Sequence, residues 1–141
     1  AALELGRRRK DAEPTEVHKV NSSIDVHRVM KADLADLPHE EFWMLLLNRA
    51  NTVIGKHFLS KGGQAGTVVD PKMVFKIALE HGAASVVLAH NHPSGNLKPS
   101  SVDVSITKKL MELGKMMEIA VHDHLIVYND TFLSLADEGY V

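Results

Sequence analysis

Two kinds of hydrophobic spacing alternate along the chain, and each predicts a different kind of element. Apolar residues three or four apart predict amphipathic helices over about 22–34, 71–81 and 101–117. Runs that are continuously apolar or strictly alternating predict strands over 41–48, 53–59, 83–89 and 119–127. The closing residues, 131–141, are either a short strand or an irregular segment. Helices placed between strands in this order predict an α/β domain.

Capping residues indicate where two of these helices begin and end. Asn21 or Ser22 can cap the first helix. Its apolar positions are Ile24, Val26, Val29 and Met30. Asp70 begins the second helix and Gly82 closes it, which is the usual placement of these two residue types.

The chain of 141 residues is long enough for one domain and too short for two ordinary ones. Residues 1–6 resemble the end of a helix closed by glycine, and 11–19 contain Pro14 and few apolar residues. We therefore expect an N-terminal extension and linker over 1–19, the end of a truncated upstream region. A single domain should follow over 20–141.

Composition narrows the class of protein. The chain is 45% hydrophobic and 24% charged, which is typical of a folded globular protein. It has neither a signal-peptide pattern nor a run near the roughly 18 apolar residues of a membrane span, so we expect a cytoplasmic protein without a membrane partner. A formal net charge of -2 argues against tight binding to DNA phosphates. Cysteine is absent, so any metal must be held by His, Asp or Glu.

A histidine pair follows the third apolar run and suggests a metal site. Side chains two apart on a strand point to the same face, so His90 and His92 could present two imidazoles to one ion. After a turn the chain reaches Asp103, a third candidate ligand. Ser100 and Asp103 also have the spacing of a capping box, which places Asp103 on the first turn of the next helix. Two histidines and a carboxylate suit zinc and leave a fourth position for water.

These residues also have plainer interpretations. Asp103 can be a helix-start carboxylate favoured by the helix dipole, and His90 and His92 can be ordinary polar residues at a strand end. Glu41 opens the most apolar strand, where a carboxylate could serve a metal-activated water as general base. By position alone, however, Glu40 and Glu41 are only a polar lead-in to that strand.

The remaining histidines are weaker candidates. We interpret His124, beside Asp123 on the last long strand, as a packed strand residue, with a role behind a metal ligand as the alternative. His57 and His122 are expected at the surface of alternating strands.

The histidines and the capping box together resemble a known motif. His-x-His-Pro at 90–93 and Ser-x-x-Asp at 100–103 are similar to the JAMM metalloprotease motif of JAB1/MPN domains. The fuller string His-Asn-His-Pro-Ser-Gly resembles the bacterial branch named RadC, long labelled a DNA repair protein. The likeness extends to 39–48 and to Asp-His at 123–124, and it covers about residues 20–141.

This resemblance implies a fold and a set of roles. The fold would be the MPN fold (JAB1/JAMM, cytidine deaminase-like), a curved mixed β-sheet flanked by helices. The zinc ligands would be His90, His92 and Asp103. Glu41, rather than Glu40, would hydrogen-bond the zinc water, take its proton and return it to the leaving amine. Ser100 would help to bind the oxyanion.

Two departures from the family pattern accompany the match. Asn91 replaces the Ser or Thr usual between the histidines of deubiquitinating members, although asparagine is habitual in the RadC branch. Lys72 and Met73 stand where that branch more often has Arg-Glu. The letters His-Asn-His do not indicate an HNH nuclease, whose motif is spread over a ββα-metal unit.

Two functional hypotheses follow. The first is a zinc-dependent hydrolase of peptide or isopeptide bonds, acting on a protein or peptide substrate. The alternative is a DNA repair or recombination accessory protein that binds nucleic acid or a protein partner without catalysis. The net charge of the chain does not support direct binding to DNA.

Overall fold

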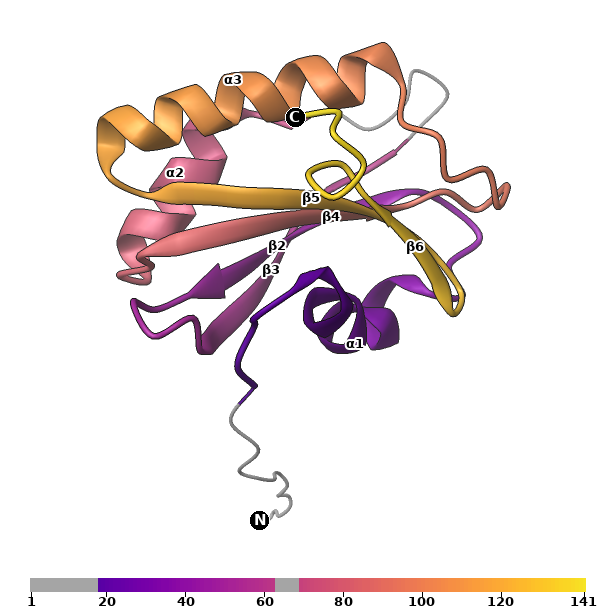
Figure 1. The fold of residues 1–141 in the computed structure, drawn as a ribbon, viewed down its shortest axis with the longest axis horizontal. Helices are drawn as coiled ribbons and strands as arrows, with labels where there is room; N and C mark the ends of the chain where they lie inside the picture. The colour runs from indigo at the N-terminus through magenta and orange to yellow at the C-terminus, as the bar shows by residue number, and fades with distance from the viewer. Residues whose placement is uncertain (1–17, 63–68) are drawn as a thin grey trace.

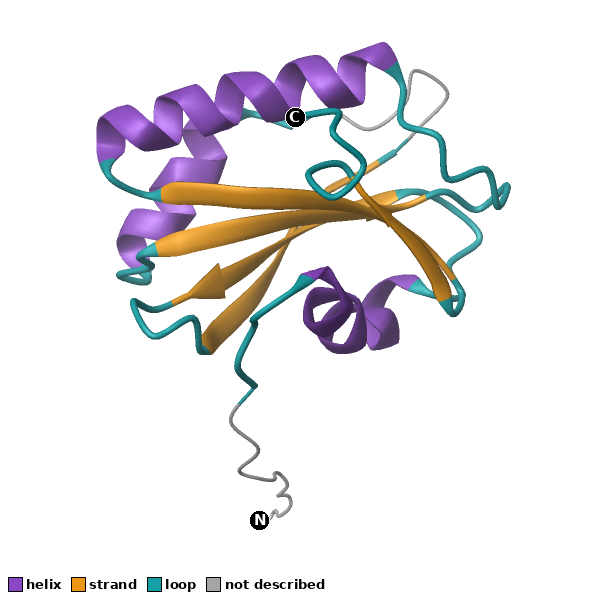
Figure 2. Cartoon of the chain, viewed as in Figure 1, coloured by secondary structure: helices purple, strands orange, loops and turns teal. Residues whose placement is uncertain are grey.

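A five-stranded mixed sheet lies between one helix on one face and two helices on the other (Figures 1 and 2). The structure is a computed structural model and describes residues 18–62 and 69–141. Its elements are α1 (Ser23–Leu34), β2 (Glu41–Leu47), β3 (Val53–Lys61), α2 (Pro71–Glu80), β4 (Ser85–Asn91), α3 (Ser101–Met117), β5 (Ala120–Tyr128) and β6 (Thr131–Ser134).

The strands follow the order β3-β2-β4-β5-β6. Only β4 and β5 pair in parallel among these neighbours, and the other three pairs are antiparallel. Parallel neighbours need a crossover, which α3 provides across the sheet in Figure 1. Because β4 is central and covered on both faces, all seven of its residues are buried. The expected fold, a mixed β-sheet flanked by helices, is thus confirmed.

Strand alternation divides the hydrophobic core into two parts. The part under α1 contains Val26, Met30, Leu34, Leu45, Leu47, Val87, Ala89, Leu125 and Val127, with Val20. The part under α2 and α3 contains Phe42, Met44, Leu46, Val74, Phe75, Ile77, Ala78, Ala83, Val86, Leu88, Leu110, Ile119 and Val121. Successive residues of β2 therefore face opposite parts of the core.

The predicted helices and strands are present, with small differences at their ends. Ser22 is the N-cap of α1 but its side chain makes no capping bond; Asp25 instead accepts a hydrogen bond from the backbone of Asn21, at 2.8 Å. Ile24 was expected on the apolar face of α1, yet it is 56% exposed because it points away from the sheet. Residues 131–134 form a strand, which settles one of the two alternatives for the closing segment.

Two further expectations concern the ends of the chain and the membrane. The predicted helix end at 1–6 and most of the predicted linker lie outside the described residues. Within the described ranges, no helix has both the length and the apolar character needed to cross a membrane.

A close backbone contact fixes the passage from α3 into β5. Glu118 adopts the left-handed conformation (φ 58°), and its N–H bonds back to the carbonyls of Gly114 and Lys115. A Cβ atom at Gly114 would lie 2.3 Å from the carbonyl oxygen of Ile119. Only glycine fits there, because no side chain tolerates such an approach.

Candidate metal centre

Three potential metal ligands converge where β4 ends and α3 begins. The Nε2 atoms of His90 and His92 lie 2.9 Å apart. The carboxylate of Asp103 lies 3.7 Å from Nε2 of His90 through Oδ1, and 3.9 Å from Nε2 of His92 through Oδ2. All three potential ligand atoms fall within 4.8 Å of one another. The structure thus brings together His90, His92 and Asp103.

The capping box at the start of α3 orients the carboxylate. The Ser100 hydroxyl accepts from the backbone N–H of Asp103 at 3.0 Å, and the N–H of Ser100 donates to Asp103 Oδ2 at 2.8 Å. Asp103 therefore caps the helix and faces the histidines at the same time, so its two interpretations are compatible. Because the carboxylate is already fixed before an ion binds, binding loses less side-chain entropy.

His92 is held in one tautomer by a backbone carbonyl. Its Nδ1 lies 2.6 Å from the carbonyl oxygen of Asn96, which can only accept a hydrogen bond. Nδ1 must therefore carry the proton, and in a neutral imidazole this leaves a bare lone pair on Nε2.

His90 is buried and neutral. It is 1% exposed, and its ring stacks on Phe42 with 5.2 Å between the ring centroids. Burial lowers the pKa of His90 to about 4, while the nearby Asp103 carboxylate acts in the opposite direction. At neutral pH, its imidazole can act as a ligand without first losing a proton.

The donor set fits zinc. Zinc bonds of about 2.0–2.2 Å in a tetrahedral site place neighbouring ligand atoms about 3.3–3.6 Å apart. The three observed separations, 2.9, 3.7 and 3.9 Å, lie on either side of that range. Two imidazole nitrogens and a carboxylate are also the chemistry that zinc accepts, and this set leaves room for a fourth ligand.

The two adjacent glutamates point to opposite faces of the sheet. Oε2 of Glu40 lies 4.0 Å from Nε2 of His92. The carboxylate of Glu41 instead accepts from Nε2 of His39 at 2.7 Å and from Nε1 of Trp43 at 3.0 Å. The hydrogen bond from His39 holds the pKa of Glu41 below its usual value. The expectation that Glu41, rather than Glu40, is the carboxylate beside the metal ligands does not match this geometry.

The physical reason is the register of β2. Phe42 pairs with His90 across the strands and stacks on its ring, so the side chain of Phe42 faces the histidines. Side chains two apart share a face. Glu40 therefore lies on the face of Phe42, and Glu41 on the other. The pairing continues to this point, since the N–H of Gly62 donates to the carbonyl of Glu40 at 2.8 Å.

Asn91 ties the two strands together at the site. Its side-chain oxygen accepts from the N–H of Glu41 and its amide donates to the carbonyl of His39, both at 2.8 Å. Asn91 is 2% exposed, so these bonds are shielded from water. The asparagine between the histidines therefore positions the backbone that carries Glu40. The strand predicted over 83–89 ended before Asn91, so this role of its side chain was not predicted; β4 in fact extends to Asn91.

A second buried histidine lies directly behind His90. His124 has no exposed surface, and its Nε2 lies 2.6 Å from Nδ1 of His90. Its Nδ1 lies 2.6 Å from the hydroxyl of Thr107 on α3. The interpretation of His124 as a packed strand residue is correct about its burial, and its contact with His90 agrees with the alternative that it supports a metal ligand from behind. Thr107 is a buried residue of α3.

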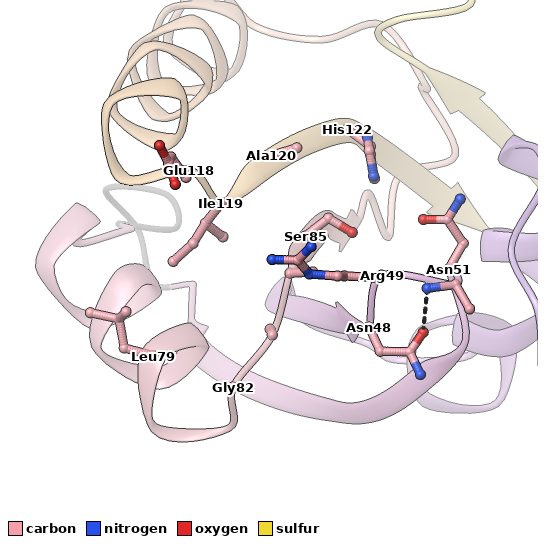
Figure 3. A pocket seen from close by; sticks show the side chains of 13 residues that line it. Asn48, Arg49, Asn51, Leu79, Gly82, Ser85, Glu118, Ile119, Ala120 and His122 are labelled. Carbon is pink, nitrogen blue, oxygen red and sulfur yellow. Dashed lines mark hydrogen bonds between the residues drawn. The ribbon is translucent and has the colours of Figure 1, made fainter.

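A cavity of about 900 Å³ opens at the opposite end of β4 (Figure 3). Ser85, Arg49 and His122 are among the residues that line it. His90 lies near the other end of the same strand, and His92 follows directly after that strand. The cavity is therefore separate from the converging ligands.

Known proteins resemble this chain over almost its whole length. A family model described as a RadC-like JAB domain matches residues 20–140. A UPF0758 protein of Flavobacterium johnsoniae is 49% identical over 139 residues, covering 99% of this chain and 61% of the relative. UPF0758 proteins of Salinibacter ruber and Porphyromonas gingivalis are 43% and 37% identical, over 142 and 140 residues. The chain covers 61% and 62% of their respective lengths, so it spans about three fifths of these relatives.

Proposed function

The chain belongs to the RadC-like JAB domain family, and we propose that it is a zinc-dependent hydrolase of peptide or isopeptide bonds. The observation that carries this proposal is the convergence of two imidazoles and a carboxylate within 4.8 Å, with a second carboxylate 4.0 Å from one imidazole. The chain spans about three fifths of the length of these relatives. The proposal therefore concerns this domain.

The proposed zinc ligands are His90, His92 and Asp103. Zinc, when bound, supplies a Lewis acid that lowers the pKa of a water molecule and polarises the scissile carbonyl. For this purpose burial keeps the imidazole of His90 uncharged, and the carbonyl of Asn96 orients the ring of His92. The chain has no cysteine, which leaves no thiolate to close the site.

The proposed general base is Glu40. Its carboxylate lies at the edge of the ligand group, where it can take a proton from the attacking water and deliver it to the leaving amine. This assignment replaces Glu41, whose carboxylate is occupied by His39 and Trp43 on the other face of the sheet.

Ser100 is proposed to stabilise the developing oxyanion. Its oxygen already accepts from the N–H of Asp103, so its own proton remains to be donated. The residue is exposed at the start of α3, next to the ligand group. A donor fixed in this way can stabilise negative charge that appears only during the reaction.

The test compares the two adjacent glutamates. Zinc-loaded protein is incubated with a peptide library and with isopeptide-linked substrates, and initial rates are measured for wild type, Glu40→Gln and the matched control Glu41→Gln. Glu40→Gln should lose about 10²- to 10⁴-fold in rate, as expected for removal of a general base, while keeping its zinc. Glu41→Gln should remain active. Wild-type rates in Glu40→Gln would reject the assignment, and an inactive Glu41→Gln that retains zinc would restore the earlier one.

A further inference from the structure

A chain of buried hydrogen bonds connects two of the proposed ligands from behind. It begins at the backbone carbonyl of Asp103, which lies 2.6 Å from the hydroxyl of Thr107 one turn later on α3. It continues from that hydroxyl to Nδ1 of His124 at 2.6 Å, and from Nε2 of His124 to Nδ1 of His90 at 2.6 Å. Thr107 and His124 have no exposed surface. Three elements, α3, β5 and β4, are thereby joined.

The direction of the first bond determines the others. The Asp103 carbonyl can only accept, so at 2.6 Å the hydroxyl of Thr107 must donate its single proton to it. Toward His124 the same oxygen can then only accept. The proton of His124 therefore sits on Nδ1, and its Nε2 carries a lone pair, since a neutral imidazole has one N–H.

His124 transmits this choice to His90. The bare Nε2 of His124 can only accept, so Nδ1 of His90 must donate to it. Both rings are buried, with His90 1% exposed and His124 without exposed surface, and in the neutral form each ring has a single N–H. His90 then has a lone pair on Nε2, the atom that faces His92 and Asp103.

We propose that Thr107 and His124 are positioning residues that hold His90 in the tautomer whose Nε2 lone pair points at the metal. The inference rests on the proposed metal site and deepens it. The chain of bonds starts at the backbone of one ligand residue and ends at the ring of another, so it also fixes the first turn of α3 against β4. Residues that hydrogen-bond to a metal ligand without touching the metal, here called outer partners, raise the affinity of a site by orienting its ligands.

The first experiment reads the tautomers directly in the full, metal-free chain. Long-range ¹H–¹⁵N correlation spectra of the histidine rings should show the Nδ1–H tautomer for both His90 and His124. In Thr107→Val, which keeps the shape and removes the hydroxyl, Nδ1–H of His124 loses its acceptor. His124 should then place its proton on Nε2 and donate to His90, which moves the proton of His90 onto the metal-facing nitrogen. An Nε2–H tautomer of His90 in the wild type, or unchanged tautomers in Thr107→Val, would overturn the inference.

The second experiment measures Zn²⁺ affinity by competition with a chromophoric chelator. Thr107→Val should bind Zn²⁺ about 10- to 100-fold more weakly than wild type, the range typical of lost outer partners. Thr107→Ser restores the hydroxyl and should bind within a small factor of wild type. Ser85→Ala, which removes a buried hydroxyl from the far end of the strand that carries His90, is the matched control and should leave the affinity unchanged.

The outcomes separate this inference from the proposed function. Wild-type protein that binds no Zn²⁺ would reject the metal site, whatever the tautomers are. Tight Zn²⁺ binding by wild type and equally tight binding by Thr107→Val would reject the positioning role alone. Thermal unfolding of each variant identifies a loss of fold, and if Thr107→Val does not fold, His124→Gln replaces it. Its amide can still accept from His90 without a link to Thr107, so it should bind Zn²⁺ more tightly than His124→Leu; equal affinities would count against the role.

Discussion

The two ends of β4 differ in what they bring together. At the amino end, Ser85 lines a cavity of about 900 Å³, and its buried hydroxyl has no hydrogen-bond partner in the described residues. At the carboxyl end, both ring nitrogens of His90 lie within 2.9 Å of another histidine nitrogen, and Asp103 faces the same point. The cavity and the three converging donor residues are thus separated along one strand. The amino end therefore offers empty volume, whereas the carboxyl end offers donor atoms that could hold a metal ion.

The topology explains why the ligands gather at one end. Parallel β4 and β5 end at the same edge of the sheet, where α/β proteins usually bind ligands. The crossover helix α3 begins at this edge, so its first turn delivers Asp103. At the opposite edge α2 and α3 end, and the residues there serve mainly to connect elements.

The largest expected effect is on Zn²⁺ binding, and it is tested by replacing one histidine at each end of the sheet. His92→Ala removes a proposed ligand and should weaken Zn²⁺ binding by more than the roughly 100-fold typical of a residue that only hydrogen-bonds to a ligand. His122→Ala is the matched control, because His122 is exposed on β5 and lines the cavity at the other end. Chelator competition measures both variants. Similar affinities for the two would remove the distinction between the ends.

A large effect on stability is expected at the cavity end. Gly114→Ala places a Cβ atom 2.3 Å from the carbonyl of Ile119, so α3 and β5 must shift. We expect a loss of about 1–3 kcal/mol in the free energy of unfolding, as for other overpacked sites. Ser105→Ala, at an exposed position of the same helix, is the control. Denaturant unfolding measures the difference, and unchanged stability of Gly114→Ala would show that the helix end yields without strain.

A smaller effect on stability is expected from the N-cap of α3, beside the proposed metal site. Ser100→Ala removes the hydroxyl that caps α3 and should lower the free energy of unfolding by about 1 kcal/mol. The backbone N–H of residue 100 continues to donate to Asp103, so Zn²⁺ affinity should change little. Ser101→Ala provides the control at the next position. A strong loss of affinity in Ser100→Ala would mean that the hydroxyl, and not the backbone, orients the carboxylate.

The smallest effect is expected from Ser85→Ala. Removing a buried hydroxyl without a partner relieves a desolvation penalty, so the free energy of unfolding should stay the same or rise by up to about 1 kcal/mol. Thermal or denaturant unfolding measures this change. Marked destabilisation would indicate that the hydroxyl has a partner, such as a water molecule in the cavity.

Local patterns in the sequence predicted the elements and pointed to the three residues that the structure brings together, while leaving plainer interpretations of those residues open. The spacing of His90 and His92 and the capping box at Ser100 and Asp103 both act over a few residues, so strand alternation and helix-start geometry could be applied directly. The same holds for α3, whose predicted bounds of 101–117 match the structure.

What the sequence could not supply depends on pairing between distant segments. Which glutamate faces the histidines follows from the register of Phe42 against His90, and a shift of one residue would exchange Glu40 and Glu41. The contact of His124 with His90 depends in the same way on the parallel register of β5 against β4. Neither register can be read from local spacing.

The most direct test of the central claim is zinc K-edge X-ray absorption on the full chain after reconstitution with one equivalent of Zn²⁺. The account predicts stoichiometric zinc with a first shell of nitrogen and oxygen at about 2.0–2.2 Å and the multiple scattering of two imidazoles. In His90→Ala the imidazole contribution should fall or the zinc should be lost. Wild-type protein that retains no zinc, or zinc without the scattering of two imidazoles, would contradict the account.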